Sequence, residues 1–487
     1  RAGTANRRRG PGDIGMTRSQ ALWLIFAAAL AIRASYTLGL YFVMGADSLL
    51  AEDSALYLEL SRIFVSEGDF LHAVGIAGHF EPETERMPLY VIWLGLHQFV
   101  SGMPGPLFPA LTQGVLDAVA CVLIARTAML LSPRLLLPAG LFAACNPTQI
   151  IVGAMILTDS LFFFFVCLML FAAVHWLRQP VWRWALLLGL ALGLGVSTRV
   201  MLLPAVVGLA IMLPLAALWL RRLRMVGFAH VLVFIAICAT LQAPILARNI
   251  SLYDSVQLTS QGGTHALLWL APLVLEAVDG TPHAEGARRM YLRYETEIAE
   301  TGEIVSENPF TRSAQMTATA RRAIAELGVI ATVKAWLIGS AINLFSPAAI
   351  LSPPVSNLPR TGFYDMAGDS KLDKLSTFLF RNDNPAYAWV LIVTFFTLLA
   401  VRAGQLIGLG HGLFQRQPGQ ITAERREVRV VLILLLLWTL YILIVNGPVA
   451  SPKYRLPIEP FGAICGAYAL LAAGDWFRRR AARRQAQ

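Results

Sequence analysis

Ten apolar stretches limit what this chain can fold into, because most of them are long enough to cross a lipid bilayer as a helix. Such a helix needs about 20 apolar residues to cross about 30 Å of hydrocarbon. Only 14% of the 487 residues are charged and 56% are hydrophobic, whereas a soluble domain has about 25% charged residues. The sequence therefore predicts an all-α polytopic membrane protein, with spans at about 21–44, 107–131, 135–155, 159–177, 183–197, 200–220, 227–247, 386–401, 430–447 and 456–474.

Basic residues fall in alternate loops between these spans, which predicts the orientation of the chain. Short cytoplasmic loops carry more lysine and arginine than the loops on the other side. An even number of spans then puts both termini in the cytoplasm and segments 45–106, 249–385 and 447–455 on the extracytoplasmic face. The net charge of +10 follows from this bias, with attraction to membrane lipids as a secondary effect. The basic loops contain Arg134, Arg178, Arg183, Arg221, Arg222, Arg224, the segment 402–429 and the tail FRRRAARRQ.

The same topology divides the chain into five parts. Lysine occurs only at positions 334, 371, 374 and 453, a bias typical of a GC-rich bacterial gene, which predicts the inner membrane of a bacterium. The first apolar stretch is too long for a signal-peptide core, so we expect it to be retained. The parts are a basic cytoplasmic tail (1–20), a transmembrane module (21–248) that includes the first outer loop (45–106), a long extracytoplasmic loop (249–385), C-terminal spans (386–476) and a second basic cytoplasmic tail (477–487).

Two shorter apolar segments and one glycine motif need separate interpretation. Residues 88–101 and 327–348 fit the charge pattern as interfacial or half-inserted helices. GLALGLG at 189–195 has small-residue spacing that suits close helix packing, and no strand precedes it as a nucleotide-binding loop requires. Arg33 lies inside the first span, where we expect it to face a neighbouring helix or to extend toward the interface.

Acidic side chains stand at two places where spans meet the predicted outer face. Glu52 and Asp53 follow the first span, and Tyr57 lies one helical turn beyond Asp53. Asp159, in LTDSLF, begins another span. Acids beside a span are commonly just solvated, and Asp159 equally suits a helix N-cap. Ionisable residues at the membrane are also default candidates for function, so the sequence leaves both interpretations open.

Cationic side chains also occur in the predicted outer loops, although most arginines of this chain lie in the predicted cytoplasmic loops and tails. One such residue alone is typical of a lipid-headgroup anchor. Several converging on one cavity would form an anion site, because the guanidinium group matches phosphate with two parallel hydrogen bonds. The candidates are Arg86 in ERMPLY, Arg199 in GVSTRVMLLP, Arg248 followed by Asn249 in ARNISLY, and Lys453, Tyr454 and Arg455 in SPKYRLPIEP.

Outer carboxylates, outer arginines and an apolar body together fit the transfer of a sugar from a lipid phosphate. The acceptor hydroxyl is a weak nucleophile, so a carboxylate base should take its proton. The leaving polyprenyl phosphate departs as an anion and needs cations rather than a proton. A glycoside hydrolase expels an alcohol instead and usually needs a second, acidic carboxyl. The lipid tail of the donor explains why such an enzyme lies in a membrane.

A series of motifs covers about residues 20–470: AEDSALY, RMPLY, NPTQI with LTDSLFFFF, GVSTRVMLLP, RNISLYDSVQLTSQGG and KYRLPIEP. In their order and spacing the chain resembles the GT-C membrane glycosyltransferases, specifically the bacterial branch near protein O-mannosyltransferases and aminoarabinose–lipid A transferases. The resemblance implies a GT-C fold with about ten transmembrane helices and interfacial helices in the outer loops. It also implies an inverting hexosyl or pentosyl transferase that uses a polyprenyl-phosphate sugar as donor substrate and needs no further cofactor.

The resemblance further implies roles for particular residues. The acid of the first outer loop acts as general base, so Asp53 is the first candidate and Glu52 the second. Asp159 matches a second acid near the active site. Cations that contact the phosphate or the lipid are matched by Arg86, Arg248 and Arg455, and the other candidates for substrate binding are Tyr57, Arg199, Asn249, Gln261, Lys453 and Tyr454, with Gly262 and Gly263 in a glycine turn.

Features that the sequence lacks narrow the choice of acceptor and exclude some ligands. The loop after residue 249 contains no obvious soluble domain, so a glycan or lipid acceptor is favoured over a protein. No soluble basic domain exists to bind nucleic acid. Several histidines lie outside any metal-ligand spacing, which predicts no required metal, and the cysteines lack CxxC spacing and are interpreted as core residues. These residues are His72, His79, His97, His265 and His283, and Cys121, Cys145, Cys167, Cys238 and Cys465.

Three other functions stay open on the sequence alone. A flippase or transporter for a lipid-linked sugar predicts internal repeats and polar residues at mid-span, whereas the acids here cluster at one face and no convincing repeat occurs. A polymerase or ligase that uses a diphosphate donor shares the outer cations, and the sequence does not separate it from the transferase. A structural membrane protein without activity fits the long amphipathic outer segments less well.

Overall fold

The computed structural model describes residues 16–486 apart from 75–78, 103–104, 223–224, 303, 359–372, 374–375, 378–379, 382–384 and 415–421. Most of the predicted N-terminal tail, residues 1–15, therefore lies outside the described residues. Within the described parts, eight helices are long and apolar enough to cross a membrane. They are α1 (Arg18–Met44), α4 (Leu107–Leu131), α7 (Thr158–Arg178), α9 (Leu203–Trp219, preceded by η3, Val200–Leu202), α10 (Met225–Tyr253), α18 (Pro385–Phe414), α19 (Thr422–Asn446) and α20 (Glu459–Ala486, preceded by η7, Pro452–Ile458).

The two other predicted spans are also helical, but one is broken and the other is short. The stretch at 135–155 forms η2 (Pro133–Leu135) with α5 (Leu136–Ala144), and then α6 (Pro147–Gly153), with a bend of 49° between them. Asn146 causes the break, because its side chain accepts hydrogen bonds from the N–H groups of Thr148 (2.9 Å) and Gln149 (3.3 Å) and so begins a new helix. The stretch at 183–197 forms α8 (Trp182–Thr198).

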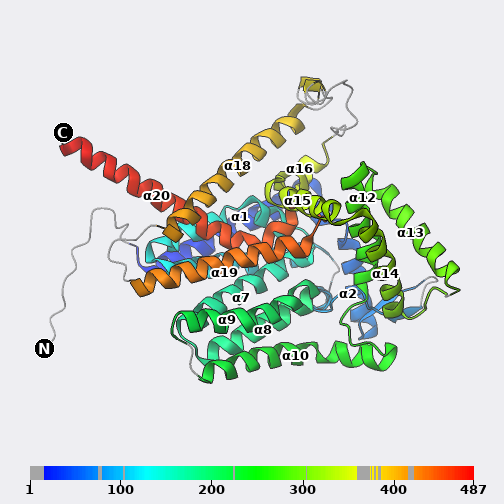
Figure 1. Cartoon of the computed structure of the whole chain (residues 1–487). Helices are drawn as coiled ribbons and strands as arrows, with labels where there is room; N and C mark the ends of the chain where they lie inside the picture. The colour runs from blue at the N-terminus through cyan, green and yellow to red at the C-terminus, as the bar shows by residue number, and fades with distance from the viewer. Residues whose placement is uncertain are drawn as a thin grey trace.

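The remaining elements belong to the two long loops, and Figure 1 shows α2 and α12–α14 at one end of the bundle, on the right, with α15 and α16 nearer its middle. We call the end that carries α2 and α11–α14 the large-loop end. The first loop forms η1 (Ala46–Leu49), α2 (Ser54–Glu67), a hairpin of β1 (Leu71–Ala73) and β2 (Phe80–Pro82) with His72 opposite Glu81, and α3 (Leu89–Ser101). The long loop forms α11 (Gln261–His265), η4 (Ala266–Leu270), α12 (Ala271–Asp279), α13 (His283–Glu300), α14 (Pro309–Leu327), α15 (Val329–Phe345), η5 (Ala348–Leu351) and α16 (Pro353–Ser356).

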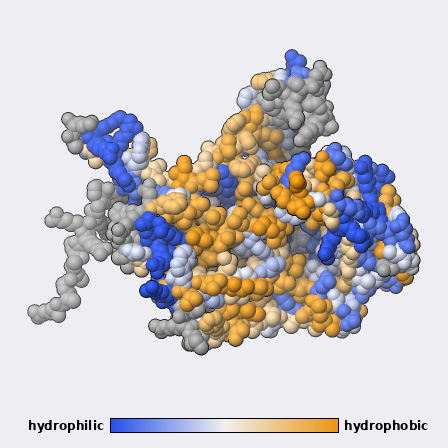
Figure 2. Space-filling view, viewed as in Figure 1, coloured by the Kyte–Doolittle hydropathy of each residue, from blue (hydrophilic) through white to orange (hydrophobic). Residues whose placement is uncertain are grey.

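The surface agrees with a membrane-spanning bundle. Figure 2 shows hydrophobic residues over the middle of the molecule and hydrophilic residues over α12–α14 at one end and the last turns of α20 at the other. The predicted helix at 327–348 is α15, which turns away from α14 by 103°. This angle follows from Gly328, whose φ of +87° separates the two helices.

Basic loops that the sequence assigned to one face meet at the opposite end of the bundle. Arg134 pairs with Asp475 at 2.7 Å, and Arg178 and Arg222 both pair with Glu427 at 2.5 and 2.8 Å. Basic residues from three inter-helix connections that are far apart in sequence are thus fastened to the two C-terminal helices, α19 and α20. This arrangement is the alternation of loops that the charge pattern predicts.

Close packing inside the bundle confirms the interpretation of the glycine motif. A Cβ atom on Gly189 would lie 2.8 Å from the Cα of Phe234, and one on Gly193 would lie 3.3 Å from the Cα of Cys238. Small residues on α8 thus let the backbone of α10 approach closely. Arg33 faces neighbouring helices, because its guanidinium donates to the Ala144 carbonyl (3.1 Å) and to Gln149 (2.9 Å).

The interpretation of the cysteines as core residues is correct at four positions and wrong at the fifth. Cys121, Cys167, Cys238 and Cys465 are buried free thiols, whereas Cys145 is exposed. The reason is the break after α5, which leaves Cys145 at the end of a helix, on the lining of a cavity.

The outer helices α13 and α14 are joined by a cluster of charges that predicts a pH-dependent loosening. Burial raises the pKa of Glu297, but hydrogen bonds from Arg322, Thr319 and Arg293 outweigh it and lower this pKa to about 2. A carboxyl with a lowered pKa stabilises the fold fully above its ordinary pKa of 4.5, and this stability is lost as the pH falls toward 2.

We therefore expect hydrogen exchange in α13 and α14 to become faster between about pH 5 and pH 2. The Glu297→Gln variant should lose part of this pH dependence, and Glu326, which pairs with Arg293 at 2.6 Å and whose pKa is also lowered, should account for what is left. Glu307→Gln, on the connection before α14, is the matched control and should keep it. An unchanged pH profile in Glu297→Gln would show that other groups control the loosening.

Candidate active site

A cavity of about 400 Å³ opens at the large-loop end. We call it the Asp53 cavity. Four segments that are distant in sequence form its wall, so it exists only in the folded bundle. Its polar lining consists of Asp53, Tyr57, Glu85 and Arg86 from the first loop, Thr198 and Arg199 from the end of α8, Thr259, Gln261 and His265 from the long loop, Asn446 from the end of α19 and Tyr454 from η7.

Asp53 is held at this cavity by hydrogen bonds between its segment and a distant loop, one of them from the Ser54 hydroxyl. Ser54 donates to the Ile156 carbonyl (2.8 Å), and the Ile156 N–H donates to the Leu49 carbonyl (3.0 Å). Asp53 is the N-cap residue of α2, but its side chain makes no capping hydrogen bond. Its carboxylate is therefore directed at the cavity instead of at the helix that it begins.

Arg86 is held by a tight loop after the hairpin. The Glu83 carboxylate accepts the N–H groups of Glu85 (2.7 Å) and Arg86 (2.9 Å). This loop is fastened to the long loop, because the Thr84 carbonyl accepts the Ser260 N–H at 2.8 Å and the two hydroxyls lie 2.9 Å apart. Two outer segments more than 170 residues apart thus fix where Arg86 points.

Asp159 forms an ion pair with Arg199 and does not cap its helix. The N-cap residue of α7 is Leu157, without a side-chain capping bond, and Asp159 lies in the first turn. Its carboxylate accepts a hydrogen bond of 2.7 Å from Arg199, with side-chain exposures of 3% and 24% for the acid and the base. Of the two interpretations that the sequence left open, the N-cap is excluded.

The pKa shifts of Tyr57 and His265 indicate that the cavity is partly dehydrated. Burial raises the pKa of the Tyr57 hydroxyl, and Arg86 and Arg199 oppose this increase. Burial lowers the pKa of His265. The carboxylate of Asp53 therefore shares a partly dehydrated space with two guanidinium groups and an imidazole that favours its neutral form.

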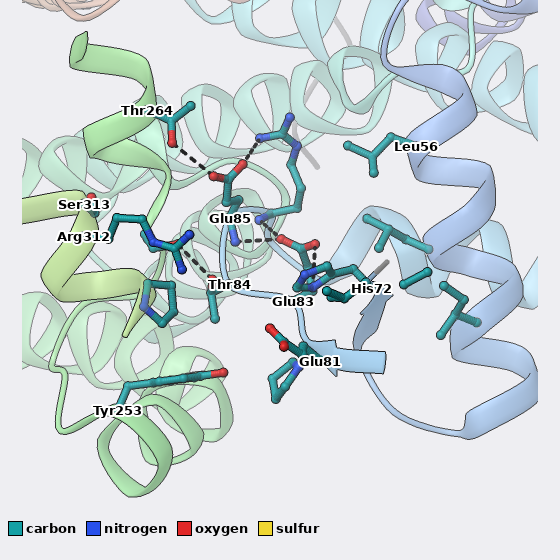
Figure 3. A pocket seen from close by; sticks show the side chains of 18 of the residues that line it. Leu56, His72, Glu81, Glu83, Thr84, Glu85, Tyr253, Thr264, Arg312 and Ser313 are labelled. Carbon is teal, nitrogen blue, oxygen red and sulfur yellow. Dashed lines mark hydrogen bonds and ion pairs between the residues drawn. The ribbon is translucent and has the colours of Figure 1, made fainter. Parts of the chain in front are cut away.

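A second cavity, of about 530 Å³, adjoins the first, and Glu85 and Arg86 line both. We call it the acidic cavity. Figure 3 shows it between α2 with the hairpin on one side and the helices that carry Tyr253, Thr264 and Arg312 on the other. Thr264 donates to Glu85 at 3.2 Å across this space. Its charged lining is Glu59, Glu81, Glu83, Glu85 and Glu307 with Arg86, Arg312 and His72.

The structure brings seven of the predicted site residues together and places the others elsewhere. Asp53, Tyr57, Arg86, Arg199, Gln261, Gly262 and Tyr454 line the Asp53 cavity, and Asp159 touches it through Arg199. Glu52, beside Asp53, is exposed and lines neither cavity.

Four predicted binding residues have other contacts. Arg248 donates to the side-chain oxygen of Asn249 (2.9 Å), and Asn249 in turn donates to the Gln257 carbonyl (2.7 Å). Lys453 lies over the Tyr454 ring. Arg455 points to the other side of η7, where it donates to Thr148 at 2.7 Å. The rotation of each helix end decides these directions, and sequence motifs do not record it.

Five polar lining residues were missed by the sequence reasoning: Glu85, Thr198, Thr259, His265 and Asn446. Glu85 stands directly before Arg86 in ERMPLY, so the motif itself contained this acid. His265 was considered only as a metal ligand, and Asn446 ends an apolar span without any local motif. For Asn446 the sequence carries no signal, because only the fold brings the end of α19 to the same cavity as α2.

The predicted glycine turn is instead a point of close helix packing. Gly262 and Gly263 belong to the short helix α11, and neither has a positive φ. A Cβ on Gly263 would lie 2.4 Å from the Ser313 carbonyl oxygen, and its N–H donates to the Ser313 hydroxyl at 2.8 Å. Gly263 therefore lets α11 reach α14, which positions Gln261 at the cavity.

Metal ligands do not cluster in the part of the chain that the structure describes. There, no group of three or more His, Cys, Asp or Glu side chains is arranged to hold a metal ion. The histidines singled out from the sequence are dispersed: His97, for example, contacts Thr112 at 2.7 Å, and His283 stacks near Trp269.

Comparison with known proteins identifies the fold. No protein-family model matches the chain, and no curated protein matches it. A solved archaeal oligosaccharyltransferase, AglB from Archaeoglobus fulgidus in complex with an inhibitory peptide and a dolichol-phosphate, is similar with a TM-score of 0.53 at 12% identity over 96% of this chain and 52% of that one. A second structure of an A. fulgidus oligosaccharyltransferase, tethered to an acceptor peptide, gives a TM-score of 0.51 at 11% identity over 94% and 50%.

ArnT from Cupriavidus metallidurans bound to undecaprenyl phosphate covers 92% of this chain and 76% of that one, with a TM-score of 0.36 at 13% identity. The chain spans about half the length of the oligosaccharyltransferases that it matches. The similarity to the two oligosaccharyltransferases extends over 96% and 94% of this chain. The chain is therefore an all-α polytopic membrane protein with the GT-C fold that its motifs implied.

Proposed function

We propose that this protein is an inverting glycosyltransferase that moves a sugar from a polyprenyl phosphate to a hydroxyl group. The observation that carries the proposal is the shared cavity of Asp53, Arg86 and Arg199. A carboxylate beside two guanidinium groups supplies a base for the nucleophile and cations for a leaving phosphate. The fold supports the same activity, since the solved AglB of this fold is described in complex with dolichol-phosphate.

The proposed reaction is a single displacement. The acceptor oxygen attacks the anomeric carbon, and the bond between that carbon and the phosphate oxygen breaks. Asp53 takes the proton of the acceptor hydroxyl, and the polyprenyl phosphate leaves with the electron pair. Arg86 and Arg199 stabilise its charge, and Asp159 holds Arg199 in place. The configuration at the anomeric carbon is inverted, since the nucleophile enters opposite the leaving group.

The acidic cavity supports a route for the acceptor. It joins the Asp53 cavity at Glu85 and Arg86 and lies among the helices of the large-loop end. Carboxylates accept hydrogen bonds from sugar hydroxyls and repel phosphate groups. A neutral or amino-bearing glycan therefore suits this cavity better than a phosphorylated lipid or an acidic acceptor.

The experiment that tests this function uses the purified protein in lipid nanodiscs with a panel of polyprenyl-phosphate hexoses and pentoses and neutral oligosaccharide acceptors. We expect one donor to yield free polyprenyl phosphate and a product of inverted anomeric configuration, with turnover unaffected by EDTA. Release of a diphosphate would favour the polymerase or ligase. Movement of the donor across the bilayer without any product would favour the flippase.

The Arg86→Gln variant should bind polyprenyl phosphate roughly 10- to 100-fold more weakly, the cost of losing one hydrogen-bonded charge. Its binding constant can be measured by microscale thermophoresis with the product lipid. Arg248→Gln removes an equal charge outside the Asp53 cavity and is the matched control, with affinity within about twofold of the wild type. Equal losses in both variants would show that the phosphate does not lie beside Arg86.

The large-loop end is proposed to face the extracytoplasmic side of a bacterial inner membrane, because the basic loops meet at the other end. In a Cys145→Ser background, a cysteine replacing exposed Glu295 should react with an impermeant maleimide added to intact cells. A cysteine replacing exposed Arg426 should react only after the cells are opened. The reverse pattern would invert the topology.

A further inference from the structure

A third cavity, of about 370 Å³, lies on the other side of η7 from the Asp53 cavity. Tyr454 lines the Asp53 cavity, whereas the next residue, Arg455, lines the third. The two cavities have no lining residue in common. The third cavity is therefore a separate space from the one that contains Asp53.

The floor of this cavity holds two cations and one anion. Glu459 accepts hydrogen bonds from Arg402 (2.8 Å) and from Asn146 (2.8 Å), and it pairs with Arg455 at 3.3 Å. The side-chain exposures are 11% for Arg402 and 3% for both Arg455 and Glu459. Among the described residues that line the cavity, Glu459 is the only carboxylate.

Among the residues that the structure describes, one positive charge is therefore left without an anionic partner in a poorly hydrated place. The other contacts of the two arginines are neutral: Arg402 donates to Gln405 (2.8 Å), and Arg455 donates to Thr148 (2.7 Å) and to the Ser346 carbonyl. Neutral oxygens satisfy N–H groups but do not cancel a charge, and an uncompensated charge inside a membrane protein is costly. The cavity thus favours an anionic occupant.

The walls and the position of the cavity specify a lipid. Thr397, Leu398 and Val401 of α18 face Ile151 of α6 across the space. Figure 1 shows that the first half of α18 diverges from the bundle, and only 6% of its apolar window is buried. Arg402 lies about 12 residues before Phe414, so roughly 18 Å from that end of the helix. An anion at this depth needs a hydrocarbon tail to reach it.

We propose that an anionic phospholipid binds in this cavity, with its phosphate beside Arg402 and Arg455 and an acyl chain between α18 and the bundle. The bilayer supplies such lipids in large excess over the polyprenyl donor. Because a ligand that binds only the folded state stabilises it, this lipid would hold α18 against the bundle.

The test compares nanodiscs of phosphatidylcholine with nanodiscs that also contain phosphatidylglycerol. Native mass spectrometry of the wild-type protein should show one retained phosphatidylglycerol, preferred over phosphatidylcholine by at least roughly fivefold, the effect of one unpaired arginine. The melting temperature should also be higher with phosphatidylglycerol. Equal retention of both lipids in the wild type would overturn the proposal without any variant.

Two neighbouring substitutions on α18 locate the site. Thr397→Trp fills the cavity and should abolish both the retained lipid and its stabilising effect. Phe396→Trp enlarges a side chain on the exposed face, where Phe396 is 60% exposed, and should keep both. Retention of phosphatidylglycerol by Thr397→Trp would show that this cavity is not a phospholipid site. Retention of polyprenyl phosphate instead of phosphatidylglycerol by the wild-type protein would show the same. These measurements do not depend on transferase activity.

Discussion

The Asp53→Asn variant is expected to lose roughly 10²- to 10⁴-fold in kcat, the contribution typical of a general base. Asparagine has nearly the same shape but cannot take the acceptor proton. Because the Asp53 side chain makes no capping hydrogen bond, the substitution should leave α2 intact. Single-turnover transfer from the polyprenyl-phosphate sugar measures the loss, and the affinity for the donor should change little.

Glu52→Gln is the control for this prediction. Glu52 is adjacent in sequence but exposed, and it lines neither the Asp53 cavity nor the acidic cavity. Its turnover should remain within about twofold of the wild type, as is usual for an exposed charge away from the chemistry. Normal turnover in Asp53→Asn together with a loss in Glu52→Gln would move the base to Glu52, and the proposed geometry would fail.

Breaking the pair between Asp159 and Arg199 should have the largest effect on stability. Asp159 is 3% exposed, so Arg199→Gln leaves a buried carboxylate without its cation. Removal of one partner of a buried ion pair typically costs about 3–5 kcal/mol. We expect a marked fall in melting temperature in detergent, and a similar fall for Asp159→Asn.

The double variant separates the structural role of this pair from its catalytic role. Asp159→Asn with Arg199→Gln leaves no unpaired charge and should recover most of the melting temperature. Its turnover should stay low, because the cavity still lacks one of its two cations. Arg288→Gln breaks an exposed ion pair with Glu285 on α13 and should change neither the melting temperature nor the turnover. Full recovery of activity in the double variant would exclude Arg199 from phosphate binding.

The membrane helices could be predicted from the sequence because their signals are local. Apolar length predicts where a helix crosses the bilayer, and the placement of arginines predicts which loops share a face. The broken span at 135–155 is the exception, since Asn146 interrupts an otherwise apolar stretch by capping a new helix. Asn146 followed by Pro147 is a recognisable helix start, but hydropathy alone averages over it.

Local motifs were less informative about the cations of the site. Arg199, Arg248 and Arg455 look alike in the sequence, as arginines near the predicted outer ends of spans. In the structure, Arg199 faces the Asp53 cavity, Arg248 is bound to its neighbour Asn249, and Arg455 faces a different cavity. Neighbouring residues of a helical segment point in different directions, so a motif match places the segment without placing the side chain.

The sequence by itself determined that the chain spans a membrane many times, that its arginine-rich loops share one end, and that Asp53 follows the first helix. Only the tertiary structure decided which charges meet Asp53. That choice depends on contacts between distant segments, such as Ser54 with Ile156 and Thr84 with Ser260. Apolar length and charge bias act along the chain, whereas a binding cavity depends on how helices rotate and dock against one another.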